Sequence, residues 1–146
     1  MNINELKFKR VMIIDDTKID RYVAAHVLKK NQFGDEIVEF DMATKAIKFL
    51  EENQHNPDVL PEVIFLDIRM PEMDGFQFLE QLAFLKLDIQ HISVIMLSSS
   101  LNAEDHMRAD SNELVKKFVN KPLDKSKLEE IKELFFQIYF NEDKAA

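Results

Sequence analysis

Residues 63–75, Val-Ile-Phe-Leu-Asp-Ile-Arg-Met-Pro-Glu-Met-Asp-Gly, lead from an apolar run into a polar loop at one acidic residue. The apolar part, residues 63–66, is typical of a strand that is covered on both faces of a parallel sheet. Asp67 follows at once, and residues 69–75 form the connection to the next helical pattern. Open α/β sheets bind their ligands beyond the carboxyl ends of the strands, so Asp67 stands where such a ligand is expected.

The same alternation of strand and helix extends over the whole chain. Apolar runs at residues 11–14, 37–40, 63–66, 92–97 and 115–119 predict strands. Helical spacing of apolar residues predicts helices around residues 19–27, 43–50, 76–83, 102–109 and 128–138. We expect Gly34 to end the first of these helices, because glycine is common just past a helix C-terminus. Repeated βα units imply a doubly wound parallel sheet with helices on both faces.

The polarity of the strands predicts their order in the sheet. The first, third and fourth runs are continuously apolar, as interior strands are. The second and fifth runs contain charged residues, as edge strands often do. This pattern suits the order 2-1-3-4-5 of flavodoxin-like folds, whose ligand site lies between the first and third strands.

Acidic residues follow both strands at that predicted site. Asp15 and Asp16 end the first strand and Asp67 ends the third, so their carboxylates should converge. Such crowding is unfavourable without a cation, and oxygen ligands suit Mg²⁺ or Mn²⁺. Ser98 and Lys121 end the fourth and fifth strands, where a hydroxyl and an ammonium could contact a phosphoryl group. The alternative is that these are ordinary polar loop residues.

Composition limits the classes of protein that remain. A chain of 146 residues fits one domain, and its net charge of −8 disfavours nucleic acid as a partner. With no cysteine, disulfides and thiolate chemistry are excluded. No signal peptide or membrane span is recognisable, so we expect a soluble cytoplasmic protein without a membrane partner.

Four segments together resemble response-regulator receiver domains of two-component systems, of the single-domain, chemotaxis-regulator type. They are VMIIDD (11–16), VIFLDIRMPEMDGF (63–76), VIMLSSS (94–100) and FVNKPL (118–123). The resemblance covers about residues 8–140, with residues 1–7 and 141–146 as short tails and no output domain. It departs from the usual pattern in having Ser98 in place of threonine and Leu114-Val115 in place of a Gly-Ala pair.

The resemblance implies a phosphoacceptor and a metal site. Asp67 would take a phosphoryl group from a histidine kinase or a histidine phosphotransfer protein. Asp16 would bind Mg²⁺ directly, Asp15 would bind it through water, and the backbone carbonyl of Arg69 would complete the protein ligands. The domain would be a signalling module with intrinsic autophosphorylation and autodephosphorylation rather than an enzyme.

The resemblance also implies a conformational switch. Ser98 and Lys121 would contact the phosphoryl group, and the Lys121–Pro122 peptide bond would be cis. Phe118 occupies the aromatic switch position, where the ring becomes buried as the Ser98 hydroxyl moves toward the phosphate; an ordinary core aromatic is the alternative. Output would pass to an unidentified protein, by direct contact or by phosphoryl relay.

Two further interpretations complete the expectations. A phosphohydrolase of the haloacid dehalogenase type also uses an aspartate nucleophile with Mg²⁺, but it places its two acids two residues apart after the first strand, whereas Asp15 and Asp16 are adjacent. Separately, Phe136, Tyr139 and Phe140 lie partly off the apolar stripe of the last helix and form a candidate docking face or weak homodimer face. Capping of the core is the alternative for these three rings.

Overall fold

The computed structural model describes residues 2–85, 87 and 91–145, and these form one parallel sheet with helices on both faces. Its strands are β1 (Phe8–Ile14), β2 (Gly34–Phe40), β3 (Val63–Leu66), β4 (Ser93–Ser98) and β5 (Val115–Asn120). They lie in the order β2-β1-β3-β4-β5, which confirms the order predicted from strand polarity and the flavodoxin-like class.

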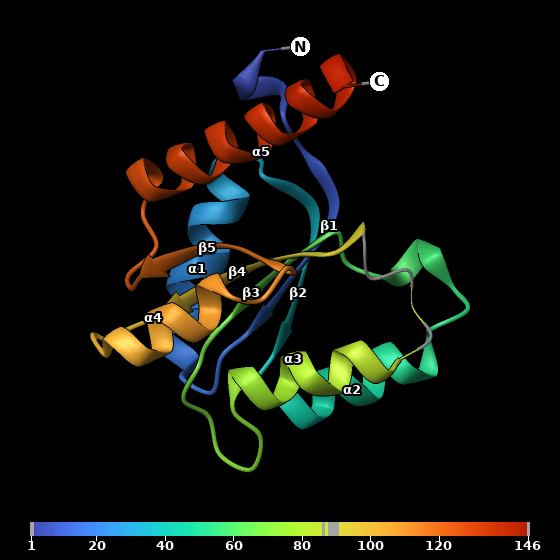
Figure 1. Cartoon of the computed structure of the whole chain (residues 1–146), viewed down its shortest axis with the longest axis vertical. Helices are drawn as coiled ribbons and strands as arrows, with labels where there is room; N and C mark the ends of the chain where they lie inside the picture. Colours follow the sequence, from blue (N-terminus) through green and yellow to red (C-terminus); the bar gives the residue numbers. More distant parts are fainter. Residues whose placement is uncertain (1, 86, 88–90, 146) are drawn as a thin grey trace.

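Two layers of helices bury the sheet. The helices are α1 (Lys18–Lys30), α2 (Ala43–Glu52), α3 (Gly75–Phe84), α4 (Ala103–Asp110) and α5 (Lys125–Ala145), with the 3₁₀ turns η1 (Ile3–Glu5) and η2 (Pro57–Val59). Helices α1 and α5 cover one face, while α2 and α3 lie on the opposite side (Figure 1). None of the helices in the described part of the chain is both long and apolar enough to cross a membrane.

The central strands contribute to both halves of the core. In β1, Val11 and Ile13 pack with α1 and α5, whereas Met12 and Ile14 pack with α2 and α3. Because successive side chains point to opposite faces of a sheet, a strand covered on both sides must be apolar throughout. This requirement explains the uninterrupted apolar runs that end at the acidic residues.

Gly34 is not the end of a helix, so that prediction was wrong. Helix α1 ends at Lys30, and Gln32 takes the left-handed backbone conformation with φ 53°. Gly34 instead begins β2, where an added Cβ atom would lie 2.8 Å from Cγ2 of Val11. The glycine therefore permits close contact between β2 and β1, rather than providing backbone freedom.

The regions expected to be tails are more structured than predicted. Leu6 is buried in the core beside Phe8, and η1 precedes it. Helix α5 continues to Ala145, past the predicted boundary at residue 140. Met1 and Ala146 lie outside the described residues.

Gly75 shapes the turn that follows β3. Its N–H donates to the Ile68 carbonyl at 2.8 Å, and a Cβ atom at this position would collide with the Asp67 carbonyl oxygen. Asp74 caps α3 by accepting from the Gln77 N–H at 2.8 Å, while the Gln77 side chain accepts from the Asp74 N–H. Helix α3 can thus begin directly against the acid-bearing end of β3.

We expect Gly75→Ala to lower the free energy of unfolding by about 2–3 kcal/mol, because the new methyl group meets backbone atoms that cannot turn away. Gly34→Ala is the matched control and should cost about 1 kcal/mol, since the methyl group there meets the side chain of Val11. Urea unfolding measures both. Helix propensity alone favours alanine at position 75 by about 1 kcal/mol, so a gain in stability would contradict the steric explanation.

Candidate functional site

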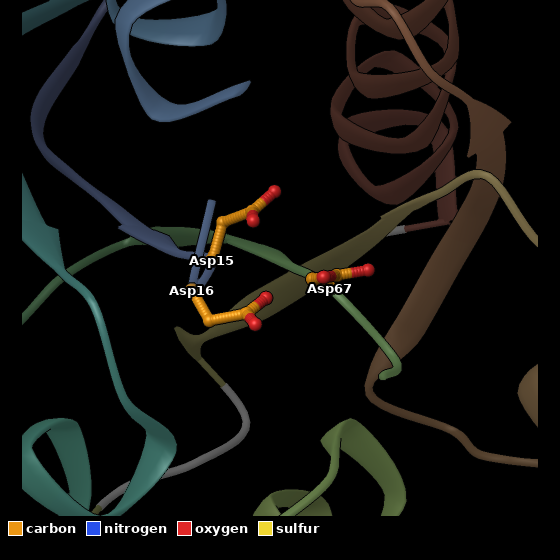
Figure 2. A group of neighbouring side chains, drawn as sticks. All are labelled: Asp15, Asp16 and Asp67. Atoms are coloured by element: carbon orange, nitrogen blue, oxygen red, sulfur yellow. The ribbon is translucent and has the colours of Figure 1, made fainter. Parts of the chain in front are cut away.

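The three predicted acids do converge at the carboxyl end of the sheet. Strands β1 and β3 are neighbours, and Ile14 is paired with Leu66. Asp15 and Asp67, the residues that follow this pair, therefore leave the sheet side by side. One carboxylate oxygen from each of Asp15, Asp16 and Asp67 lies within 4.8 Å of the others, and Asp16 extends toward Asp67 from the end of β1 (Figure 2).

Burial differs among these acids. Asp15 is 3% exposed and Asp67 is 6% exposed, whereas Asp16 is open to solvent. Backbone amides hold both buried carboxylates in place: Oδ1 of Asp67 accepts from the Ile68 N–H at 2.8 Å, and Oδ1 of Asp15 accepts from the Thr17 N–H at 2.9 Å. The buried pair is fixed, and the exposed acid is accessible from solution.

The electrostatic cost of this arrangement appears in the pKa values. Burial, followed by the charge of Asp15, raises the pKa of Asp67 to about 6, although Lys121 and the Ile68 amide act in the opposite direction. Burial also raises the pKa of Asp15, against the hydrogen bonds from Lys121 and Thr17. Both buried carboxylates are thus more costly to ionise than carboxylates in water.

Lys121 supplies the positive charge within the site. Its Nζ atom lies 2.7 Å from Oδ2 of Asp15, 3.3 Å from Oδ2 of Asp67 and 2.9 Å from Oδ2 of Asp20. Burial by itself would lower the pKa of Lys121, but its acidic partners outweigh burial and raise the pKa. The Lys121 N–H donates to the Ser98 carbonyl at 3.0 Å, and the Lys121–Pro122 peptide bond is cis.

Ser98 is the last residue of β4, and Arg69 lies in the loop after β3. Ser98 is 1% exposed, and its Oγ atom accepts from the Ser100 N–H at 3.2 Å. The Arg69 guanidinium forms an ion pair at 2.7 Å with Asp105 on α4, and Asp105 also accepts from Oγ of Ser100 at 2.7 Å. The loops after β3 and β4 are therefore joined through one carboxylate.

Phe118 is partly buried at the α2–α3 side of the sheet. Its ring stacks on the imidazole of His106, with centroids 3.7 Å apart. A partly buried ring on β5 is compatible with a switch position and equally with a core aromatic, so the role of Phe118 stays a prediction.

The candidate docking face on α5 also stays a prediction. Phe136 is partly buried and stacks with Phe140 at 6.0 Å between centroids, while Tyr139 is 41% exposed and packs beside Phe8.

Sequence reasoning missed Asp20 and Asp105. Asp20 reaches Lys121 from the first turn of α1, across 101 residues of sequence. Asp105 is buried to 3% exposure within a helix of mostly polar residues. A sequence signal exists only for Asp20, which lies one helical turn beyond Asp16 and could have been placed near the same strand end.

The donor set determines which ligand the site can hold. Carboxylate oxygens grouped at a sheet end suit a hard divalent cation such as Mg²⁺ or Mn²⁺, which binds through one or two carboxylates together with phosphate. Lys121 lies 3.3 Å from Asp67, and Ser98 ends the strand next to β3; their contact with a phosphoryl group stays a prediction. The residues present fit a divalent metal next to a phosphoryl acceptor.

Comparison with known proteins places this site in a family. Residues 11–133 match the response regulator receiver domain. Probable histidine kinase 3 of Oryza sativa subsp. japonica is 37% identical over 81 residues, which cover 56% of this chain and 7% of the kinase. Response regulator Rcp1 of Synechocystis sp. is 29% identical over 98 residues, 66% of each protein.

Solved structures share the fold over a greater length. A two-component response regulator from Cytophaga hutchinsonii superposes with a TM-score of 0.79 and 25% identity, covering 91% of this chain and 98% of that one. The Mn²⁺-bound form of Rcp1 gives a TM-score of 0.66 at 23% identity, covering 85% and 88%. Matching fold, strand-end acids and family together lead to one conclusion: the chain belongs to the response regulator receiver domains, the signalling domains of two-component systems.

Proposed function

We propose that Asp67 accepts a phosphoryl group from a histidine kinase or a histidine phosphotransfer protein, in a reaction that depends on Mg²⁺ or Mn²⁺. The observation that carries this proposal is that Asp67 lies close both to the other two acids and to Lys121. A carboxylate next to both a candidate metal site and an ammonium has close to it both kinds of group that neutralise phosphoryl oxygens.

The transfer itself asks little covalent chemistry of the protein. A carboxylate oxygen of Asp67 forms a bond to phosphorus while the bond from phosphorus to the donor imidazole nitrogen breaks, and the imidazole leaves. The bound metal would neutralise phosphoryl oxygens during this exchange. Lys121 would pair with another phosphoryl oxygen, since its Nζ atom lies 3.3 Å from Asp67, and the Ser98 hydroxyl, at the end of the neighbouring strand β4, would donate to a third.

The metal ligands follow from what each acid already contacts. Asp15 is occupied by Lys121 and the Thr17 amide, which favours contact with the metal through water. Asp16 is exposed to solvent and close to Asp67, so we assign it as the direct ligand together with Asp67. The backbone carbonyl of Arg69, two residues after Asp67, completes the proposed protein ligands.

Phosphorylation would then change a surface. Ser98 is buried, and movement of its hydroxyl toward the phosphoryl group would alter the space next to β5, where Phe118 stacks on His106. Two discrete packings biased by a local charge are a known basis for switching. The altered surface would contact an unidentified downstream protein, or Asp67 would pass the phosphoryl group onward.

The acceptor assignment predicts the outcome of chemical phosphorylation. Incubation with acetyl phosphate and Mg²⁺ should add one phosphoryl group to the wild-type protein and none to Asp67→Asn, measured by intact mass. Asp110→Asn, which changes an exposed acid on α4, is the control and should be labelled like the wild type. Undiminished labelling of Asp67→Asn would remove the assignment.

The metal assignment predicts the effect of losing Asp16. We expect Asp16→Asn to weaken Mg²⁺ binding by about tenfold or more, since even groups that only surround a metal commonly contribute that much. Asp41→Asn, at a partly buried acid that follows β2 at the same end of the sheet and pairs with Lys45, should bind like the wild type. Isothermal titration calorimetry gives both affinities, and equal values would exclude Asp16 as a ligand.

The raised pKa of Asp67 predicts how stability depends on pH without metal. Because the folded-state pKa of about 6 exceeds the ordinary 3.8, folding favours the protonated carboxyl; this contribution is complete below pH 3.8 and is lost as the pH rises through 6. With a chelator present, Asp67→Asn should exceed the wild type in unfolding free energy by roughly 2–3 kcal/mol above pH 7. The difference should vanish toward pH 4. Urea unfolding across this range tests it, and a difference that does not vary with pH would contradict it.

A further inference from the structure

Asp105 is a buried carboxylate that touches neither Asp67 nor Lys121, yet it joins two loops of the site. Its side chain is 5% exposed, and its Oδ2 atom lies 2.7 Å from Nη2 of Arg69 and 2.7 Å from Oγ of Ser100. A buried charge is costly unless it is paired and hydrogen-bonded, and here one oxygen has both kinds of partner. The three residues come from the loop after β3, the loop after β4, and α4.

Each partner of Asp105 is linked to a group with a role in the proposed phosphorylation: Ser100 contacts the Ser98 hydroxyl, and Arg69 carries a proposed metal-binding carbonyl. The Ser100 N–H donates to Oγ of Ser98 at 3.2 Å, and Oγ of Ser100 also accepts from the Asn102 N–H at 3.2 Å. Ser100 therefore orders the loop that presents the Ser98 hydroxyl. Arg69 carries the backbone carbonyl that is the proposed third metal ligand, so anchoring its side chain restrains that carbonyl.

We propose that Asp105 is a positioning residue of the phosphorylation site, acting through Arg69 and Ser100. This inference rests on the proposed function of Asp67, and it assigns Asp105 no contact with the reacting atoms. Its carboxylate holds the Arg69 backbone for the metal and the Ser98 hydroxyl for the phosphoryl group at the same time. The Arg69 side chain is 62% exposed, so substituting Arg69 removes the ion pair with Asp105 without altering the core.

The test uses Asp105→Asn, Arg69→Ala and the double variant in the full chain. Two quantities are measured: Mg²⁺ affinity of the unphosphorylated protein by calorimetry, and the rate of phosphorylation by acetyl phosphate. We expect each single variant to lower Mg²⁺ affinity and rate about tenfold, as residues that orient metal ligands commonly do. Because the Arg69 side chain acts only through its contact with Asp105, the double variant should lose no more than Asp105→Asn alone.

Two variants separate this role from general damage. Glu104→Gln makes the same change of charge at an exposed neighbour on α4 and should leave both quantities unchanged. Arg69→Lys, which keeps an ion pair with Asp105, should recover part of what Arg69→Ala loses. If Asp105→Asn does not fold by circular dichroism, Arg69→Ala together with Ser100→Ala decides the question.

Several results would overturn the positioning role. Wild-type values in both Arg69→Ala and Asp105→Asn would do so, as would additive losses in the double variant. Opposite effects of the two single variants would show that Arg69 acts on the phosphoryl group directly. If the wild-type protein takes up no phosphoryl group on Asp67, the proposed function fails, and the Mg²⁺ affinities still decide the role of Asp105.

Discussion

The ammonium group of Lys121 lies 2.7 to 3.3 Å from three carboxylates. These ion pairs offset the repulsion among the acids at this end of the sheet. Parallel strands bring acidic residues together from distant parts of the chain, and two of them, Asp15 and Asp67, are buried. Lys121 does not fully offset these effects: burial, followed by the charge of Asp15, keeps the pKa of Asp67 raised to about 6. A divalent metal bound among these carboxylates would offset the remaining negative charge.

Main-chain contacts of the fold hold the acids and Lys121 in these positions. The pairing of Ile14 with Leu66 sets Asp15 beside Asp67. The N–H of Lys121, which follows β5, donates to the Ser98 carbonyl at the end of β4. On the far side of Asp67, Gly75 brings the start of α3 against the strand end. Each of these contacts involves main-chain atoms, so the positions of the acids depend little on the identity of surrounding surface residues.

Local sequence patterns were enough to predict the sheet and the acids at its strand ends. They did not predict the contacts between residues far apart in the sequence. The continuous apolar run at Val63–Leu66 identified an interior strand because burial on both faces leaves no place for a polar residue. Gly34 was misjudged because a glycine after a helical pattern usually ends a helix, whereas its real constraint is the nearby side chain of Val11. Asp105 could not be found, since a helix of mostly polar residues gives no indication of which one is buried.

Figure 1 shows that η1 and the far end of α5 lie next to each other, away from the loops that hold the acids. A domain whose two ends meet is a portable unit: it can be inserted into a longer polypeptide, or joined to one, without displacing its interior. The matching segment of a rice histidine kinase is 7% of that protein, so a similar sequence does stand within a longer polypeptide there. This modularity depends only on the path of the backbone. Because the two ends lie away from the acids, a segment joined to either end need not disturb the site.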